Sequence, residues 1–75
     1  MAHAQYLPET VEGKLDHVQE ECAEVILAIA KMKRFGWESR NPAYPDSPTN
    51  IHHLRQEIGE AIFAMQRFMT ALGIP

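Results

Sequence analysis

The sequence has little of the chemistry that small proteins often use for structure or catalysis. Cys22 is the only cysteine in 75 residues, which excludes a disulfide framework and a cysteine-based zinc cluster. Because it falls in an apolar helical pattern, its thiol is expected to be buried and inert. There is no glycine-rich phosphate loop, and no Ser–His–Asp set can be argued. These absences leave the acidic side chains as the main candidates for a site.

Excess positive charge and long apolar segments are also missing. A net charge of −3 argues against a nucleic-acid polymer as partner, because such binders present a basic face. The longest nearly apolar run, "VILAIA", is far too short to span a bilayer. The start of the chain, "MAHAQYLPET", lacks the charged and apolar parts of a signal peptide. We expect a cytoplasmic protein with no membrane partner.

The spacing of apolar residues predicts two helices within a single domain spanning 1–75. Pro8 and Thr10 are start signals for a first helix over about 11–35, although Gly13 weakens its first turn and favours a start nearer Leu15. A loop over about 36–50 follows, rich in proline and small polar residues. A second helix is expected over about 51–72, capped by Thr49 or Asn50. We see no internal repeat.

The fold class that follows is all-α, a two-helix hairpin completed into a four-helix bundle by oligomerisation. Two helices cannot cover each other's apolar surface, and the first helix is apolar on several sides. Ala23, Leu27 and Ala30 lie outside its main apolar stripe. A homodimer or homotetramer of this chain is therefore expected.

Each predicted helix carries a pair of glutamates three residues apart. Turning the helices by about 100° per residue places Glu21 and Glu57 about 80°, and Glu24 and Glu60 about 140°, from the apolar stripes on the same flank. In an antiparallel hairpin, equal flanks bring both pairs to one side, and their heights along the helices agree. Four carboxylates beside apolar surface would repel one another, and a hard divalent cation relieves this. The alternative is a solvated acidic face.

The segments "EECAEV" and "EIGEAIFAM" resemble the ExxE and ExxD motifs of the MazG-like all-α nucleoside triphosphate pyrophosphohydrolases. The resemblance covers roughly residues 15–69, with the same order of acidic helix, loop and acidic helix. It implies a Mg²⁺-dependent enzyme, with Mn²⁺ as a substitute, that hydrolyses a nucleoside triphosphate to the monophosphate and pyrophosphate. It also implies that Glu21, Glu24 and Glu57 bind the metal. Glu60 stands where the family has Asp.

Further site residues are expected around these acids. One carboxylate not committed to metal, Glu20 or Glu24, is the candidate to orient or deprotonate the attacking water. Candidate substrate-binding residues are Lys31, Lys33, Arg34 and Trp37. The three cations can reach phosphates or simply complement the helix dipole. The aromatic rings of Trp37 and Tyr44 can stack on a base or anchor the loop.

For the histidines, exposure to solvent is the favoured expectation. His17 lies one turn before Glu21 and can support a metal ligand, but an exposed histidine is favoured. His52 and His53 open the second helix, where exposure is also favoured. A di-iron bundle would need Glu-x-x-His pairs, which the chain lacks.

Two functions from different classes remain open. The first is a nucleotide pyrophosphohydrolase that cleans or balances the nucleotide pool. The second is a non-catalytic helical oligomerisation module with a degenerate acidic site. Magnesium-dependent release of pyrophosphate separates them, and the base and sugar of the substrate are not specified by the sequence.

Overall fold

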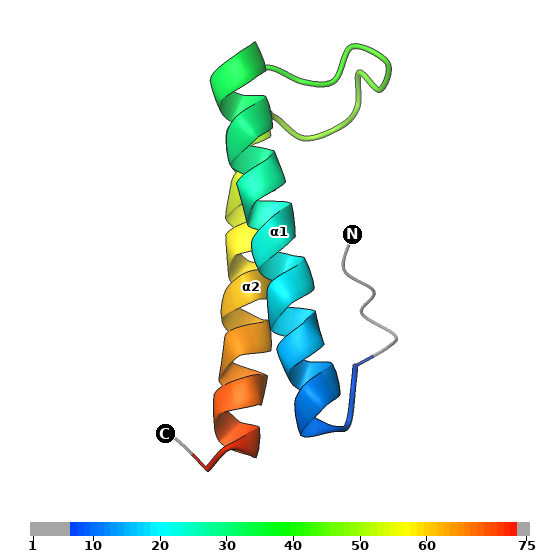
Figure 1. Ribbon diagram of the computed structural model, residues 1–75. Helices are drawn as coiled ribbons and strands as arrows, with labels where there is room; N and C mark the ends of the chain where they lie inside the picture. The colour runs from blue at the N-terminus through cyan, green and yellow to red at the C-terminus, as the bar shows by residue number, and fades with distance from the viewer. Residues whose placement is uncertain (1–6, 74–75) are drawn as a thin grey trace.

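The computed structural model describes residues 7–73, in which two helices pack side by side as an antiparallel hairpin (Figure 1). Helix α1 is Val11–Phe35 and helix α2 is Asn50–Ala71. No strand occurs in this part of the chain, so the prediction of an all-helical, two-helix chain is confirmed. Neither helix has the length and apolarity needed to cross a membrane within residues 7–73. The four-helix bundle requires a second chain and stays a prediction.

Helix α1 begins at Val11, earlier than the start nearer Leu15 that Gly13 favoured. The Thr10 hydroxyl accepts a hydrogen bond from the Gly13 N–H at 2.9 Å, which caps the first turn. A Cβ on Gly13 would lie 2.8 Å from the Cβ of Pro8. Gly13 is therefore a site of close packing between the first turn and the preceding segment, and the tight cap offsets its low helix propensity.

The loop between the helices is tied down at both ends. Gly36 ends α1 with φ 106°, a conformation that favours glycine, and its N–H donates to the Met32 carbonyl at 2.9 Å. The side-chain amide of Asn50 donates to the Gly36 carbonyl at 2.9 Å, which joins the two ends of the loop. Thr49 caps α2 by accepting from the His52 N–H at 3.4 Å. These local bonds set where α2 starts relative to the end of α1.

The interface between the helices is built from a small set of apolar side chains. The buried ones are Ala28, Met32, Leu54, Ala61 and Ala64. Alanines on both helices let the two backbones approach closely, which brings neighbouring side chains of α1 and α2 within reach of each other. The Arg67 guanidinium also donates to the Pro8 carbonyl at 3.0 Å and holds the segment before α1 against α2.

Much of the apolar surface of the single chain is exposed. The exposed large side chains on the helices are Val11, Leu15, Ile26, Leu27, Phe35, Ile58, Ile62, Phe63, Met65 and Met69. Soluble monomers rarely present so many of these together. The exposure supports the expectation of an oligomer, which remains a prediction.

Candidate metal site

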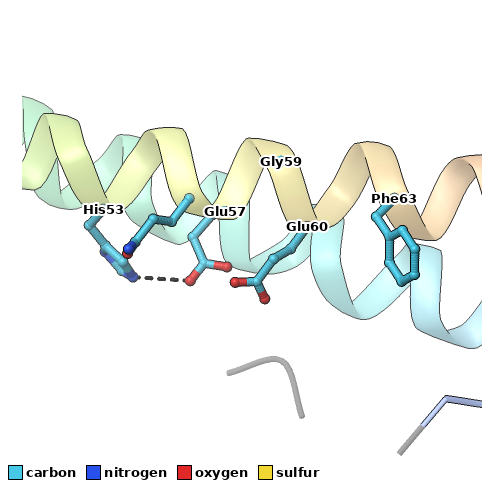
Figure 2. Close-up of a pocket in the computed structure, with 6 residues that line it drawn as sticks. His53, Glu57, Gly59, Glu60 and Phe63 are labelled. Atoms are coloured by element: carbon cyan, nitrogen blue, oxygen red, sulfur yellow. Dashed lines mark hydrogen bonds and ion pairs between the residues drawn. The ribbon is translucent and has the colours of Figure 1, made fainter. Parts of the chain in front are cut away.

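Three glutamates from the two helices converge at the centre of the hairpin. Glu21 of α1 and Glu57 and Glu60 of α2 each bring one carboxylate oxygen within 4.8 Å of the others. Glu21 is 0 % exposed and Glu57 is 5 % exposed, while Glu60 is half-buried. Figure 2 shows the carboxylates of Glu57 and Glu60 pointing to the same side of α2. This is a buried acidic centre, and not a solvated acidic face.

Helical periodicity explains how the three side chains meet. Glu57 and Glu60 are three residues apart and therefore share a face of α2. Glu21 lies one turn before Val25, which packs against the core of Ala28, Met32 and Leu54. The close approach of the helices then places Glu21 opposite the α2 pair.

The carboxylate oxygens lack the partners that buried charges normally have. Among residues 7–73, buried oxygens without a hydrogen bond include both oxygens of Glu21, Oε1 of Glu57 and Oε1 of Glu60. Leaving a buried charged group unpaired is costly, so such groups in a folded protein call for an explanation. A cation held between the three carboxylates would give these oxygens a partner.

The electrostatics of Glu21 reflect the same crowding. Burial raises the pKa of Glu21 above its usual value, and the neighbouring Glu60, Glu57 and Glu20 charges raise it further, while His17 acts in the opposite direction. The folded protein therefore resists ionising Glu21 unless positive charge is supplied.

Two histidines contact the acidic centre, contrary to the expectation that they are exposed. The Nε2 atom of His53 lies 3.0 Å from Oε2 of Glu57, and its side chain is 33 % exposed (Figure 2). The Nε2 atom of His17 lies 3.5 Å from Oε2 of Glu21, and its side chain is only 11 % exposed. Both are drawn inward because a histidine four residues before a glutamate shares its helix face. His52 is exposed, as expected.

A sequence signal for this arrangement exists and was missed. The pattern His-x-x-x-Glu-x-x-Glu occurs at residues 17–24 and again, 36 residues later, at 53–60. Ala28 and Ala64, both buried, are related by the same offset. The two helices thus carry a weak internal repeat, so the view that the sequence has none needs correction. In an antiparallel hairpin this repeat produces an approximate two-fold relation around the acidic centre.

The donor set fits a hard divalent cation. Mg²⁺ and Mn²⁺ prefer carboxylate and water oxygens, and Mg²⁺ usually keeps several waters. Three carboxylates with unpartnered oxygens, drawn from two helices, offer such ligands. An added cation would neutralise the charges that burial and mutual repulsion disfavour.

The other residues expected at the site lie farther out. Glu24 is half-buried and is not one of the three converging acids, and Glu20 is exposed. Among the expected substrate-binding residues, Lys31 lines a cavity, whereas Lys33, Arg34 and Trp37 are exposed and do not line it. Cys22 is half-buried.

Two hollows have His53 in their walls. One, of about 500 Å³, is lined by Glu57, Glu60, His53 and Phe63 on α2. The other, of about 660 Å³, lies under the loop and is lined in part by Lys31, Arg40, Tyr44 and His53. The acidic side chains of Glu57 and Glu60 line only the first of them. Arg40 was not predicted as a site residue, because a single arginine in a loop carries no periodic signal.

Comparisons of the chain with protein-family models, with curated proteins and with solved structures gave no match. The fold and the site describe an all-helical hairpin with three converging glutamates that could hold a metal ion.

Proposed function

We propose that this protein is a divalent-metal-dependent nucleoside triphosphate pyrophosphohydrolase. The observation that carries the proposal is the convergence of Glu21, Glu57 and Glu60 with buried, unpartnered oxygens. These residues belong to the two motifs that resemble the MazG-like enzymes. We propose Mg²⁺ as the natural cofactor, with Mn²⁺ as a substitute, and a homodimer or homotetramer as the working assembly.

The chemistry of phosphoanhydride hydrolysis suits such a site. Cleavage requires neutralisation of phosphate charge and a positioned water, and it needs no nucleophilic side chain. A bound divalent cation supplies that neutralisation. Glu21, Glu57 and Glu60 would hold the cation, and Glu24 remains a proposed fourth ligand from the family pattern. The half-buried Glu24 or the exposed Glu20 would orient or deprotonate the water.

The cavity under the loop supports a substrate that is longer than a phosphate group. Lys31 and Arg40 contribute positive charge to its wall, and Tyr44 contributes an aromatic face. Because His53 borders both hollows, a ligand with its phosphates at the acidic centre has room to extend toward the loop. A nucleotide combines these properties, since its anionic end and its flat base are separated by a sugar. Substrate binding by Lys33, Arg34 and Trp37 would require a movement of these side chains toward the cavity, or their enclosure by a second chain.

The test is a panel of common and modified nucleoside triphosphates assayed for pyrophosphate release with Mg²⁺, with Mn²⁺ and with chelator. We expect metal-dependent release from at least one nucleotide and its loss in Glu21→Gln. His52→Leu, a change at an exposed residue of the same protein, is the matched control and should behave like the parent. A protein that oligomerises but releases nothing from any nucleotide would instead support the non-catalytic module.

The position of the cut distinguishes this reaction from other phosphatases. Phosphorus NMR of the products should show a nucleoside monophosphate and pyrophosphate. A nucleoside diphosphate with orthophosphate would contradict the proposed reaction class.

A further inference from the structure

The histidine–glutamate contacts divide the oxygens of the acidic centre into two kinds. Oε2 of Glu57 faces the His53 ring, and Oε2 of Glu21 faces the His17 ring. Oε1 of Glu21, Glu57 and Glu60 is buried and has no hydrogen-bond partner among residues 7–73. One oxygen of Glu57 is thus hydrogen-bonded to a ring and the other is left for a ligand. Both oxygens of Glu21 lack a hydrogen bond, and its Oε2 lies 3.5 Å from the His17 ring.

The protonation of the rings follows from the chemistry of their partners. An ionised carboxylate only accepts hydrogen bonds, so the ring nitrogen facing it must carry the proton. That nitrogen is Nε2 in both histidines. The other nitrogen of His17, Nδ1, is buried with no partner in the described chain.

The geometry points to His17 and His53 as positioning residues that orient the metal-binding glutamates. His53 would donate its Nε2–H to Oε2 of Glu57 and so fix the rotamer of that carboxylate with Oε1 turned toward the cation. The longer His17 contact would support Glu21 more weakly. Hydrogen bonds of this kind to ligating carboxylates recur in metal sites, and their loss typically costs about 10–100-fold in metal affinity. The inference rests on the metal site of the proposed function, and it does not require the hydrolytic activity.

The two contacts are unequal, which makes the inference sharper. His53 lies at hydrogen-bond distance, 3.0 Å, whereas His17 lies 3.5 Å from Oε2 of Glu21 and makes no hydrogen bond to it. Loss of His53 is therefore expected to weaken metal binding more than loss of His17.

The experiment measures Mn²⁺ affinity by electron paramagnetic resonance in the absence of nucleotide. We expect His53→Leu to weaken binding by about 10–100-fold and His17→Leu by less. His53→Gln keeps an N–H donor near the position of Nε2 and should restore most of the affinity. His52→Leu is the control, because His52 is adjacent but exposed and should not change the affinity. A His53→Leu protein that binds as tightly as the parent, or a His53→Gln protein as weak as His53→Leu, would overturn the inference.

Two measurements on the parent protein do not depend on how the variants fold. Long-range proton–nitrogen NMR spectra of the Mg²⁺ form should show the Nε2–H tautomer at His53, and an Nδ1–H tautomer would overturn the inference. Electron spin echo modulation of bound Mn²⁺ should show no directly coordinated nitrogen. A strong nitrogen coupling would make the histidines ligands and refute a positioning role.

The outcomes separate this inference from the proposed function. A parent that binds Mn²⁺ and requires His53, yet hydrolyses no nucleotide, would uphold the positioning role and refute the enzyme. A parent that hydrolyses nucleotides and binds Mn²⁺ regardless of His53 would uphold the enzyme and refute the positioning role. Absence of any Mn²⁺ binding would refute both the positioning role and the proposed metal-dependent enzyme.

Discussion

Glu21 affects both the stability of the fold and the proposed metal site. Its side chain is fully buried, its carboxylate lies near Glu57 and Glu60, and its oxygens are without a hydrogen bond within residues 7–73. A buried carboxylate without partners is expected to destabilise the metal-free fold, and the cation of the proposed function would relieve that cost. The protein is therefore expected to respond to metal and to pH in linked ways.

The metal-free protein should lose stability as pH rises above the ordinary pKa of Glu21, which is 4.5. Because burial raises the pKa of Glu21 in the folded state, the unfolded chain ionises first, and the folded state binds more protons in this window. Stability is thus greatest at or below the ordinary pKa and declines until pH passes the raised value. Thermal melts across this range, at constant protein concentration and with chelator, measure the slope.

Glu21→Gln should flatten that slope. It removes the buried charge, so the metal-free variant at neutral pH should be more stable by about 1–3 kcal/mol. For a domain of this size each kcal/mol corresponds to roughly 4–8 °C in Tm. The same variant should lose the rise in Tm that Mg²⁺ or Mn²⁺ produces in the parent. Glu38→Gln, at an exposed loop residue, should change neither property. An unchanged pH slope in Glu21→Gln would contradict this view of the site.

Glu60 is one methylene longer than the aspartate of the MazG-like motif that it resembles, and its substitution tests whether it is a metal ligand. Because Glu60 joins the converging acids as it stands, Glu60→Asp should retract the carboxylate and lower pyrophosphate release. Glu60→Gln should lower it further, by at least the roughly 10–100-fold that loss of an outer-shell partner costs. Both are measured at saturating Mg²⁺. A faster Glu60→Asp enzyme would indicate a decayed site, and a fully active Glu60→Gln enzyme would show that Glu60 is not a ligand.

At the scale of the helices, the two helical glycines differ in whether a side chain would fit at their positions. Both Gly13 and Gly59 lie inside helices, where alanine is the better helix former by about 1 kcal/mol. At Gly59 a Cβ meets nothing within 4 Å, whereas at Gly13 it would lie 2.8 Å from Pro8 and 2.9 Å from the capping hydroxyl of Thr10. Replacing glycine by alanine is therefore expected to destabilise the protein at Gly13 in α1 and to stabilise it at Gly59 in α2.

Gly59→Ala should stabilise the protein by about 0.5–1 kcal/mol, because it restricts the unfolded chain and meets no obstacle. Gly13→Ala should destabilise it, because Pro8 is rigid and the cap must shift. Chemical denaturation of the two variants beside the parent measures both effects. Equal stabilisation by the two alanines would show that the segment before α1 does not pack as described.

At the scale of the whole molecule, the apolar surface that the hairpin leaves exposed supports the proposed assembly with further copies of the chain. Ile26 of α1 is 68 % exposed and Ile62 of α2 is 49 % exposed, and they belong to a larger set of exposed apolar side chains. Burial of this surface between copies of the chain would supply the area that obligate interfaces typically cover.

Sedimentation at micromolar concentration should therefore show a dimer or a tetramer. Ile62→Glu should shift the protein toward smaller species by placing a charge in the contact. Thr70→Glu is the control, since Thr70 is exposed on the same helix and lies about 80° around it from Ile62. A parent that sediments as a well-folded monomer would refute the expected assembly.

The helices could be predicted closely from the sequence because their determinants are local. Expected ranges of 11–35 and 51–72 compare with the observed Val11–Phe35 and Asn50–Ala71. Thr10, Gly36 and Thr49 act on bonds within a few residues, and apolar spacing is a property of each helix alone. The flank shared by Glu21, Glu57 and Glu60 also follows from periodicity, once the hairpin is taken as antiparallel.

Only the tertiary structure decided which polar groups are buried and which carboxylates meet. Glu24 and Glu60 occupy equivalent positions in the two helices, yet Glu60 joins the group of three and Glu24 does not. His17 and His53 were expected to be exposed, but they lie against the glutamates one turn away. These differences arise from the distance and rotation between the helices. Alanine contacts and loop bonds set both quantities jointly, so the periodicity of either helix alone leaves them undetermined.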